Sequence, residues 1–128
     1  MRNMRSFKEE YTFEERLKES TEMIAKYPDR VPVIAERYAR TDLPDLEKQK
    51  FLVPRDMSVG QFIHILSGRL HLPAGKALFI FMKNVLPETS RLMGAVYESN
   101  KDEDRFLYLC YSTEKTFGCP GCNARGEC

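Results

Sequence analysis

The sequence lacks an excess of charge of either sign. Its 128 residues carry 20 Lys and Arg against 19 Asp and Glu, which gives a formal net charge of +1. Proteins that bind DNA or RNA mainly through the phosphates carry clustered positive charge. The balanced composition argues against this class, and we expect no nucleic-acid partner.

The sequence also lacks a long apolar run. Its first ten residues, "MRNMRSFKEE", contain no apolar core of the length that a signal peptide needs. No window approaches the roughly eighteen apolar residues of a membrane-spanning helix. We therefore expect a cytoplasmic chain, on which any membrane attachment is added after synthesis.

Cysteine is scarce, and three of the four cysteines lie in the last ten residues. In a reducing cytosol Cys110, Cys119, Cys122 and Cys128 are expected to be thiols rather than a disulfide framework. Cys119 and Cys122 form a CxxC pair, but a structural zinc site needs four ligands and Cys128 supplies only a third. A redox CxxC normally sits at a helix start, which this short polar stretch does not offer. A thiol or zinc module remains the less favoured alternative function.

No Ser-His-Asp or Cys-His arrangement is visible in the chain. Cys110 alternates with Leu107 and Leu109 in an apolar segment, which is typical of a small sheet residue rather than a nucleophile. We therefore expect a protein without enzyme activity and without a cofactor or metal.

What the chain does have is the composition of one globular domain, with 42% hydrophobic and 30% charged residues. At this length roughly two thirds of the unfolded chain's surface can be buried on folding. The fold therefore needs neither a metal nor a disulfide.

Two capping boxes mark helix starts. Thr12 and Glu15 predict a helix over Phe13–Lys26, and Ser58 and Gln61 predict a second helix that follows them. The apolar residues of the first helix recur on one face, at Phe13, Leu17, Ile24 and Tyr27. We expect this face to dock on the rest of the domain.

Four apolar segments predict strands. They are "VPVIA" beginning near Arg30, "KFLVP", "ALFIFM" and "RFLYLCYS", with a short helix predicted at "SRLMGAVYESN". Pro32 cannot donate to a strand ladder, so we expect its nitrogen to face outward or to lie at an irregularity. The order is one helix followed by β-β-α-β-α-β. It predicts an α+β fold of the ubiquitin-like β-grasp type, with one sheet packed on a principal helix.

The segment "KFLVP" is apolar on both faces, because Lys50, Leu52 and Pro54 point to one side of a strand and Phe51 and Val53 to the other. The residues alone favour a central strand that is covered on both sides. The alternative is an edge strand whose side chains line two pockets.

At "YPDRVPVI", "KFLVPRDMSVGQF" and "RFLYLCYSTEKTFG" the chain closely resembles the autophagy-related ubiquitin-like modifier family. This family includes GABARAP and the microtubule-associated protein light-chain-3 proteins, and the resemblance is closer to the GABARAP branch. It is colinear from about Phe7 to Gly118. It implies a ubiquitin-like core at 29–118, two additional helices in an N-terminal extension at 1–28, and a C-terminal propeptide tail at 119–128.

The resemblance also implies a processing and conjugation pathway. In such proteins a cysteine protease cuts after the glycine, here between Phe117-Gly118 and Cys119. Activating and conjugating enzymes then pass the Gly118 carboxyl through thioesters to the amine of phosphatidylethanolamine. A residue without Cβ suits this step, because it lets an extended peptide thread a narrow enzyme cleft. The alternative is that Gly118 only begins a frayed tail.

Conjugation implies a change of location. Phosphatidylethanolamine brings two acyl chains, whereas a single chain gives only marginal and reversible anchoring. We expect a cytoplasmic precursor that moves to the autophagosome membrane, and from there to the vacuole or lysosome.

The resemblance favours the edge-strand interpretation of "KFLVP". In this family the strand accepts cargo-receptor peptides with an aromatic residue, two spacers and an aliphatic residue, by strand addition. Carried over by position, the aromatic pocket is lined by Glu19, Met23, Pro32, Lys50, Leu52 and Phe106. The aliphatic pocket is lined by Phe51, Val53, Pro54, Met57, Phe62 and Ile65, with Arg30 nearby.

Each of these residues also has a simpler interpretation. Phe62, Ile65 and Phe106 taken singly are typical core residues, and Lys50 and Arg30 are typical solvated charges. The sequence therefore keeps a second hypothesis open, a β-grasp peptide-binding adaptor that is never conjugated.

Overall fold

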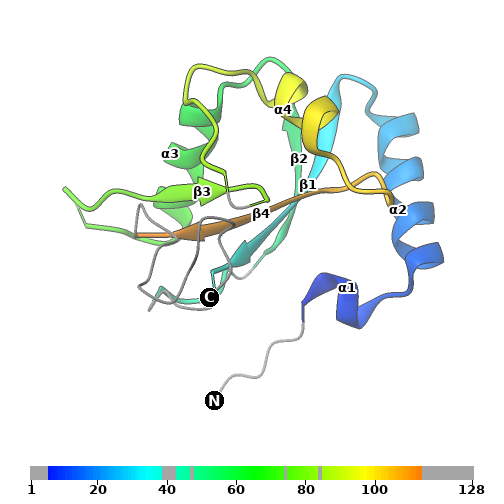
Figure 1. The fold of residues 1–128 in the computed structure, drawn as a ribbon, viewed down its shortest axis with the longest axis horizontal. Coiled ribbons are helices and arrows are strands. Elements are labelled where there is room, and N and C mark those ends of the chain that lie inside the picture. The colour runs from blue at the N-terminus through cyan, green and yellow to red at the C-terminus, as the bar shows by residue number, and fades with distance from the viewer. Residues whose placement is uncertain (1–5, 39–42, 47, 74, 84, 114–128) are drawn as a thin grey trace.

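The computed structural model describes residues 6–38, 43–46, 48–73, 75–83 and 85–113 (Figure 1). In chain order the elements are α1 (Phe7–Glu10), α2 (Phe13–Lys26), β1 (Arg30–Arg37), β2 (Lys50–Pro54), α3 (Val59–Arg69), β3 (Phe79–Phe81), α4 (Met93–Asn100) and β4 (Leu107–Ser112). The predicted order of helix and then β-β-α-β-α-β is confirmed. Two helices were expected before the core. One is α2, which the capping box predicted, and the other is the single turn of α1.

The strands form one mixed sheet in the order β2-β1-β4-β3. β1 runs parallel to β4 and antiparallel to β2, while β3 is antiparallel to β4. The first and last strands of the chain are therefore neighbours in the middle of the sheet. This is the predicted α+β architecture of the β-grasp type. Among the described helices, none has both the length and the apolar content for a membrane crossing.

Capping boxes set the starts of three helices. The Thr12 hydroxyl accepts the Glu15 N–H at 3.1 Å, and the Glu15 carboxylate accepts the Thr12 N–H at 2.8 Å, which starts α2 at the predicted residue. Ser58 and Gln61 make the same pair of bonds before α3. A third box, which begins at Ser6, starts α1.

The sheet is covered on both faces, with α2 and α3 on opposite sides of it (Figure 1). The main core lies on the α3 side and is formed by buried strand residues such as Val33, Phe51 and Leu109 together with Phe62 and Leu66 of α3. On the other face a smaller cluster holds Phe7, Ile34 and Phe106, with Met23 packed against it. Side chains alternate between the faces along each strand, so both clusters draw on the same strands.

The docking of α2 differs from the sequence prediction. Its one fully buried side chain is Ser20, while Phe13, predicted to face the domain, is 42% exposed. The Arg16 guanidinium lies over the Phe13 ring, 5.7 Å from its centre. The prediction was wrong for Phe13, because the N-terminal half of α2 is attached by polar bonds rather than by an apolar face.

Candidate functional site

Among the described strands β2 lies at the edge of the sheet, so the central-strand interpretation of "KFLVP" is wrong. The two side-chain pockets of the edge interpretation stay a prediction. No described strand pairs with its outer side. The Ala35 N–H donates to the Gln49 carbonyl at 2.9 Å, and bonded pairs alternate along an antiparallel ladder. The main-chain groups of Phe51 therefore face β1, opposite Val33. Those of Lys50 and Leu52 point outward from the sheet.

The structure brings the predicted aromatic-pocket residues together on the α2 side of this edge. They come from α2 (Glu19, Met23), β1 (Pro32), β2 (Lys50, Leu52) and the residue before β4 (Phe106). Pro32 lies opposite Leu52 in the β1–β2 register. Its own nitrogen faces the β4 side rather than outward, so that part of the prediction was wrong. It lies one residue before the β1–β4 pairing begins at Val33, just beyond the end of that ladder. Met23 packs against the cluster that contains the fully buried Phe106.

An ion pair between Glu19 and Lys50 joins α2 to the edge strand. Both side chains remain about one third exposed, and the Lys50 ammonium also lies 5.9 Å from the centre of the Phe7 ring. Lys50 is therefore a paired residue rather than a freely solvated charge. Exposed ion pairs of this kind contribute little to stability, so a ligand can replace the bond at small cost.

The predicted aliphatic-pocket residues lie on the α3 side, and half of them belong to the core. Phe51, Val53 and Phe62 are 7%, 3% and 1% exposed. The rings of Phe51 and Phe62 meet edge to face at 5.6 Å. The simpler core interpretation is therefore confirmed for Phe62, as it is for Phe106.

The accessible surface on this side comes from the other three residues. Pro54 and Met57 are half-buried, while Ile65 is 37% exposed, so the core interpretation of Ile65 was wrong. Arg30 is exposed at the start of β1, with its guanidinium 5.4 Å from the centre of the Tyr27 ring.

Sequence reasoning missed two cations next to the aliphatic side. The Lys48 ammonium and the Arg69 guanidinium lie 5.8 Å and 5.3 Å from the centre of the Phe51 ring. With Leu46 and His71 they line a hollow of about 230 Å³. Arg69 follows Ile65 by four residues on α3, a spacing that places both on one helix face, so the sequence did carry a signal for it.

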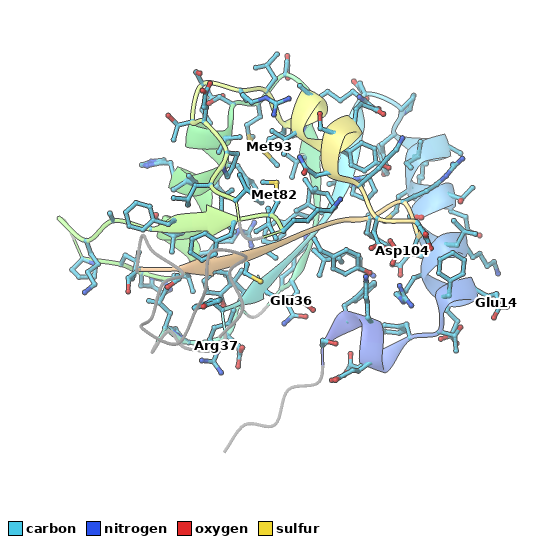
Figure 2. All side chains as sticks on the ribbon, viewed as in Figure 1. Glu14, Glu36, Arg37, Met82, Met93 and Asp104 are labelled. Carbon is cyan, nitrogen blue, oxygen red and sulfur yellow. The ribbon has the colours of Figure 1, made fainter. Side chains whose placement is uncertain are left out.

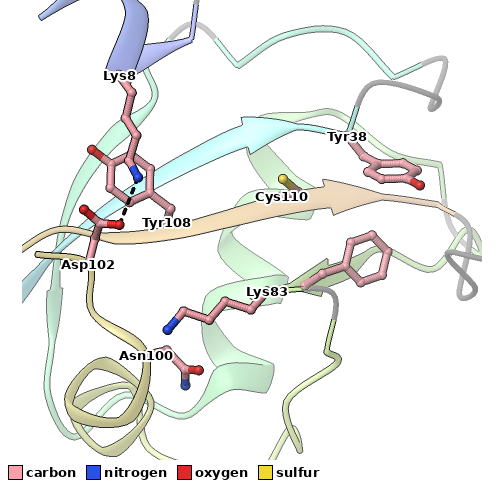
Figure 3. A pocket seen from close by; sticks show the side chains of 8 residues that line it. Lys8, Tyr38, Lys83, Asn100, Asp102, Tyr108 and Cys110 are labelled. Atoms are coloured by element: carbon pink, nitrogen blue, oxygen red, sulfur yellow. Dashed lines mark hydrogen bonds and ion pairs between the residues drawn. The ribbon is translucent and has the colours of Figure 1, made fainter. Parts of the chain in front are cut away.

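A separate pocket of about 320 Å³ lies over β4, on the same sheet face as α1 (Figure 3). None of the predicted peptide-binding residues lines it. Its lining residues are Lys8, Tyr38, Phe81, Lys83, Asn100, Asp102, Tyr108 and Cys110. The Lys8 ammonium bridges to the Asp102 carboxylate at 2.9 Å on one side of it.

The Cys110 thiol in this pocket is poorly suited to nucleophilic chemistry. Burial, and then the negative charge of Glu36, raise the pKa of Cys110 to about 11. The thiol is therefore almost wholly protonated near neutral pH, in agreement with the interpretation of Cys110 as a sheet residue. Among the described residues, no group of three or more His, Cys, Asp or Glu side chains is arranged to hold a metal ion.

The predicted processing residues Phe117, Gly118 and Cys119 lie outside the described residues, as do Cys122 and Cys128. The last described strand, β4, ends at Ser112. The propeptide and its CxxC pair therefore remain predictions from the sequence.

Known proteins share both the sequence and this geometry. The family model "Autophagy protein Atg8 ubiquitin like" matches residues 15–118. Autophagy-related protein 8i of Arabidopsis thaliana is 70% identical over 115 residues, which cover 90% of this chain and 100% of that protein. Autophagy-related protein 8D of Oryza sativa subsp. japonica is 66% identical over 115 residues, with 89% and 98% covered.

Solved structures agree with the sequence relatives. The crystal structure of Trypanosoma brucei ATG8 superposes with a TM-score of 0.83 at 40% identity, and covers 91% of this chain and 100% of that one. Plasmodium falciparum Atg8 in complex with a Plasmodium falciparum Atg3 peptide gives 0.79 at 42% identity, with 87% and 98% covered. The match to the family model and the identities of these relatives show that the chain belongs to the Atg8 family of ubiquitin-like autophagy proteins.

Proposed function

We propose that this chain is a ubiquitin-like modifier of autophagy that is cleaved after Gly118 and conjugated through the freed carboxyl to phosphatidylethanolamine. The observation that carries the proposal is the family match, which spans the core and ends at residue 118, with residues 119–128 beyond it. A cysteine protease removes those residues, because Gly118 has no free carboxylate to activate while they are attached. The chain itself is a substrate of the pathway and not an enzyme. Its place in the GABARAP-like branch stays a prediction.

The partners follow from this pathway. Activating and conjugating enzymes carry the Gly118 carboxyl as a thioester before it reaches the lipid amine. The Plasmodium falciparum relative was solved with an Atg3 peptide, which supports an equivalent conjugating-enzyme partner for this chain. The lipid's two acyl chains then hold the domain on the autophagosome membrane. From there the conjugated chain reaches the vacuole or lysosome.

On the membrane the chain acts as an adaptor for cargo receptors. The outward main-chain groups of Lys50 and Leu52 at the sheet edge support strand addition by an extended peptide. The aromatic anchor of the peptide enters between α2 and β2, in a pocket lined by Met23, Leu52 and Phe106. An aliphatic anchor lies against Pro54, Met57 and Ile65, with the buried Phe51, Val53 and Phe62 beneath them.

A Gly118→Ala variant tests the conjugation step. The position follows the last strand, so one added methyl group is expected to leave the fold unchanged, while a channel selected for glycine rejects the side chain. Both forms are incubated with the matching protease and conjugating enzymes and with phosphatidylethanolamine vesicles. Mass spectrometry and vesicle flotation are the readouts. Wild type loses residues 119–128 and floats, and the variant does neither.

The same assay separates the alternatives. If wild type keeps its tail and stays off the vesicles but binds aromatic-x-x-Leu peptides, the chain is an unconjugated adaptor. If cleavage and lipidation of Gly118→Ala match wild type, Gly118 is not the acceptor carboxyl.

A further inference from the structure

Helix α2 carries two of the six residues of the proposed aromatic pocket, and its N-terminal half is held by polar bonds. α2 contributes Glu19 and Met23 to the pocket, yet its one fully buried side chain is the polar Ser20. Apolar contacts are non-directional and tolerate sliding, whereas a hydrogen bond requires a set distance and angle. The bonds that α2 makes therefore decide where the helix lies over the sheet.

Apart from the partly exposed Glu19–Lys50 ion pair, the bonds between α2 and the sheet converge on Asp104, in the turn before β4 (Figure 2). Its fully buried carboxylate accepts the Arg16 guanidinium at 2.5 Å and the Tyr108 hydroxyl at 2.5 Å. Its carbonyl oxygen accepts the Ser20 hydroxyl at 2.6 Å. Arg16 and Ser20 are one helical turn apart and thus on the same face of α2, so the helix is fixed at two points to one residue.

Asp104 also fixes the other wall of the same pocket. Its second carboxylate oxygen accepts the Phe106 N–H at 2.9 Å. Phe106 is fully buried in the cluster against which Met23 packs. The two sides of the proposed pocket, the helix and the residue before β4, are therefore tied to one carboxyl group.

We infer that Asp104 is a positioning residue for aromatic-anchor recognition, because it holds α2 at the height and rotation at which Met23 faces Phe106. This inference rests on the proposed peptide-binding function. Asp104 itself touches no ligand and acts through Arg16, Ser20 and Phe106. Without the two bonds to α2, the helix keeps its one-sided contact with the sheet but loses its register, and the aromatic pocket loses its defined depth.

A purely stabilising role makes a different prediction from a positioning role. A loss of stability lowers the folded fraction of the protein and weakens the binding of every peptide by the same factor. Lost positioning weakens the aromatic anchor alone, because the aliphatic anchor lies on the α3 side of the sheet, away from α2. The contribution of each anchor must therefore be measured separately.

The experiment measures dissociation constants by calorimetry for three peptides: an aromatic-x-x-Leu peptide, the same peptide with Ala for the aromatic residue, and the same peptide with Ala for the Leu. The proteins are full-length wild type, Arg16→Ala, Ser20→Ala and the conservative Arg16→Lys. Val96→Ala is the control, since Val96 is fully buried in α4 and belongs to the main core cluster rather than to the cluster that holds Phe106. It lowers stability through a cavity and leaves α2 in place.

In wild type we expect each anchor to contribute about thirtyfold in affinity. In Arg16→Ala the aromatic contribution falls to less than about fivefold while the aliphatic contribution is unchanged. Ser20→Ala shifts in the same direction by less, and Arg16→Lys recovers part of the aromatic contribution. Val96→Ala keeps both contributions. Equal loss of both contributions in Arg16→Ala, or an unchanged aromatic contribution, overturns the inference.

A peptide-free measurement keeps the inference separate from the proposed function. Nuclear Overhauser contacts between the Met23 methyl and the ring protons of its cluster are expected in wild type and Val96→Ala, and are lost in a folded Arg16→Ala. If wild type binds none of the peptides, the proposed peptide-binding function fails. In that case, Met23 contacts that are retained in Arg16→Ala refute the positioning role of Asp104. Contacts that are lost support the role of Asp104 in setting the position of α2.

Discussion

At the scale of single residues, neighbours in sequence have different roles on the edge strand. Phe51 is 7% exposed and packs on Phe62, whereas Leu52 is half-buried and points to the α2 side. Phe51→Ala is therefore expected to cost about 3–5 kcal/mol of folding stability. A loss of binding in that variant would say little about recognition.

Leu52→Ala is the cleaner test of the proposed aromatic pocket. Its side chain lies opposite Pro32 outside the main core, so the fold is expected to be retained. Binding of an aromatic-x-x-Leu peptide is expected to weaken by about tenfold or more, which is ~1.4 kcal/mol. Fluorescence titration measures the affinity and thermal unfolding checks the fold. Unchanged affinity in a folded variant would remove Leu52 from the binding site.

Cys110 gives a second residue-scale prediction. Because burial and Glu36 raise the pKa of Cys110 from 9.0 to about 11, its thiolate fraction near neutral pH is expected to be roughly a hundredfold lower than in the unfolded chain. In the native protein the rate of Cys110 alkylation by iodoacetamide should be low and should still rise with pH above 9. In the urea-unfolded chain the rate should level off there. Peptide mass spectrometry follows the site. Equal native and unfolded rates would contradict the partly buried position opposite Glu36.

At the scale of elements, the outward edge of β2 can be detected in the free protein. The register makes the N–H groups of Phe51 and Val53 bond to β1 and leaves those of Lys50 and Leu52 facing outward. We expect rapid hydrogen exchange at Lys50 and Leu52 and slow exchange at Phe51 and Val53. An aromatic-x-x-Leu peptide should protect the fast pair. Resolved amide exchange by NMR measures all four, and a fast pair that stays fast with saturating peptide would exclude strand addition at β2.

Local signals in the sequence predicted the element starts well. The bonds of a capping box lie within four consecutive residues, so Thr12 and Ser58 could be assigned without any tertiary information. The position of β2 in the sheet could not. That position depends on the pairing of β1 with β4, which lies more than sixty residues later in the chain. The residues of "KFLVP" are equally compatible with a central strand and with an edge strand that is covered on both faces.

The candidate site, like the fold, could be predicted only in part from the sequence. The resemblance selected residues that the structure does bring together, such as Met23 and Phe106. It did not indicate that Phe51 and Phe62 are mainly core residues or that Phe13 is exposed. Those properties depend on how α2 and α3 pack against the sheet. For α2 that packing includes the bonds of Asp104 to Arg16 and Ser20, which no sequence pattern marked.

At the scale of the whole molecule, the folded domain and the propeptide are expected to be separable. The two core clusters draw on residues from Phe7 to Tyr111, all of them before the proposed cleavage site. A chain that ends at Gly118 should therefore unfold within about 2 °C of the full-length chain and bind the aromatic-x-x-Leu peptide equally well. Calorimetry of both forms decides this. A large drop in melting temperature, or loss of a stoichiometric zinc ion, would favour the thiol or zinc module.

The parallel pairing of β1 with β4 has a mechanical consequence. β4 is the strand that precedes the proposed lipid anchor in the sequence, and it is joined to β1 over five successive residue pairs, while β1 is joined to the proposed peptide-binding edge. When tension between membrane and cargo is directed along the strands, it loads these hydrogen bonds in shear and shares the force among them, instead of opening them one after another. A modifier built in this way is suited to act as a tether under load when the pull is directed along its strands.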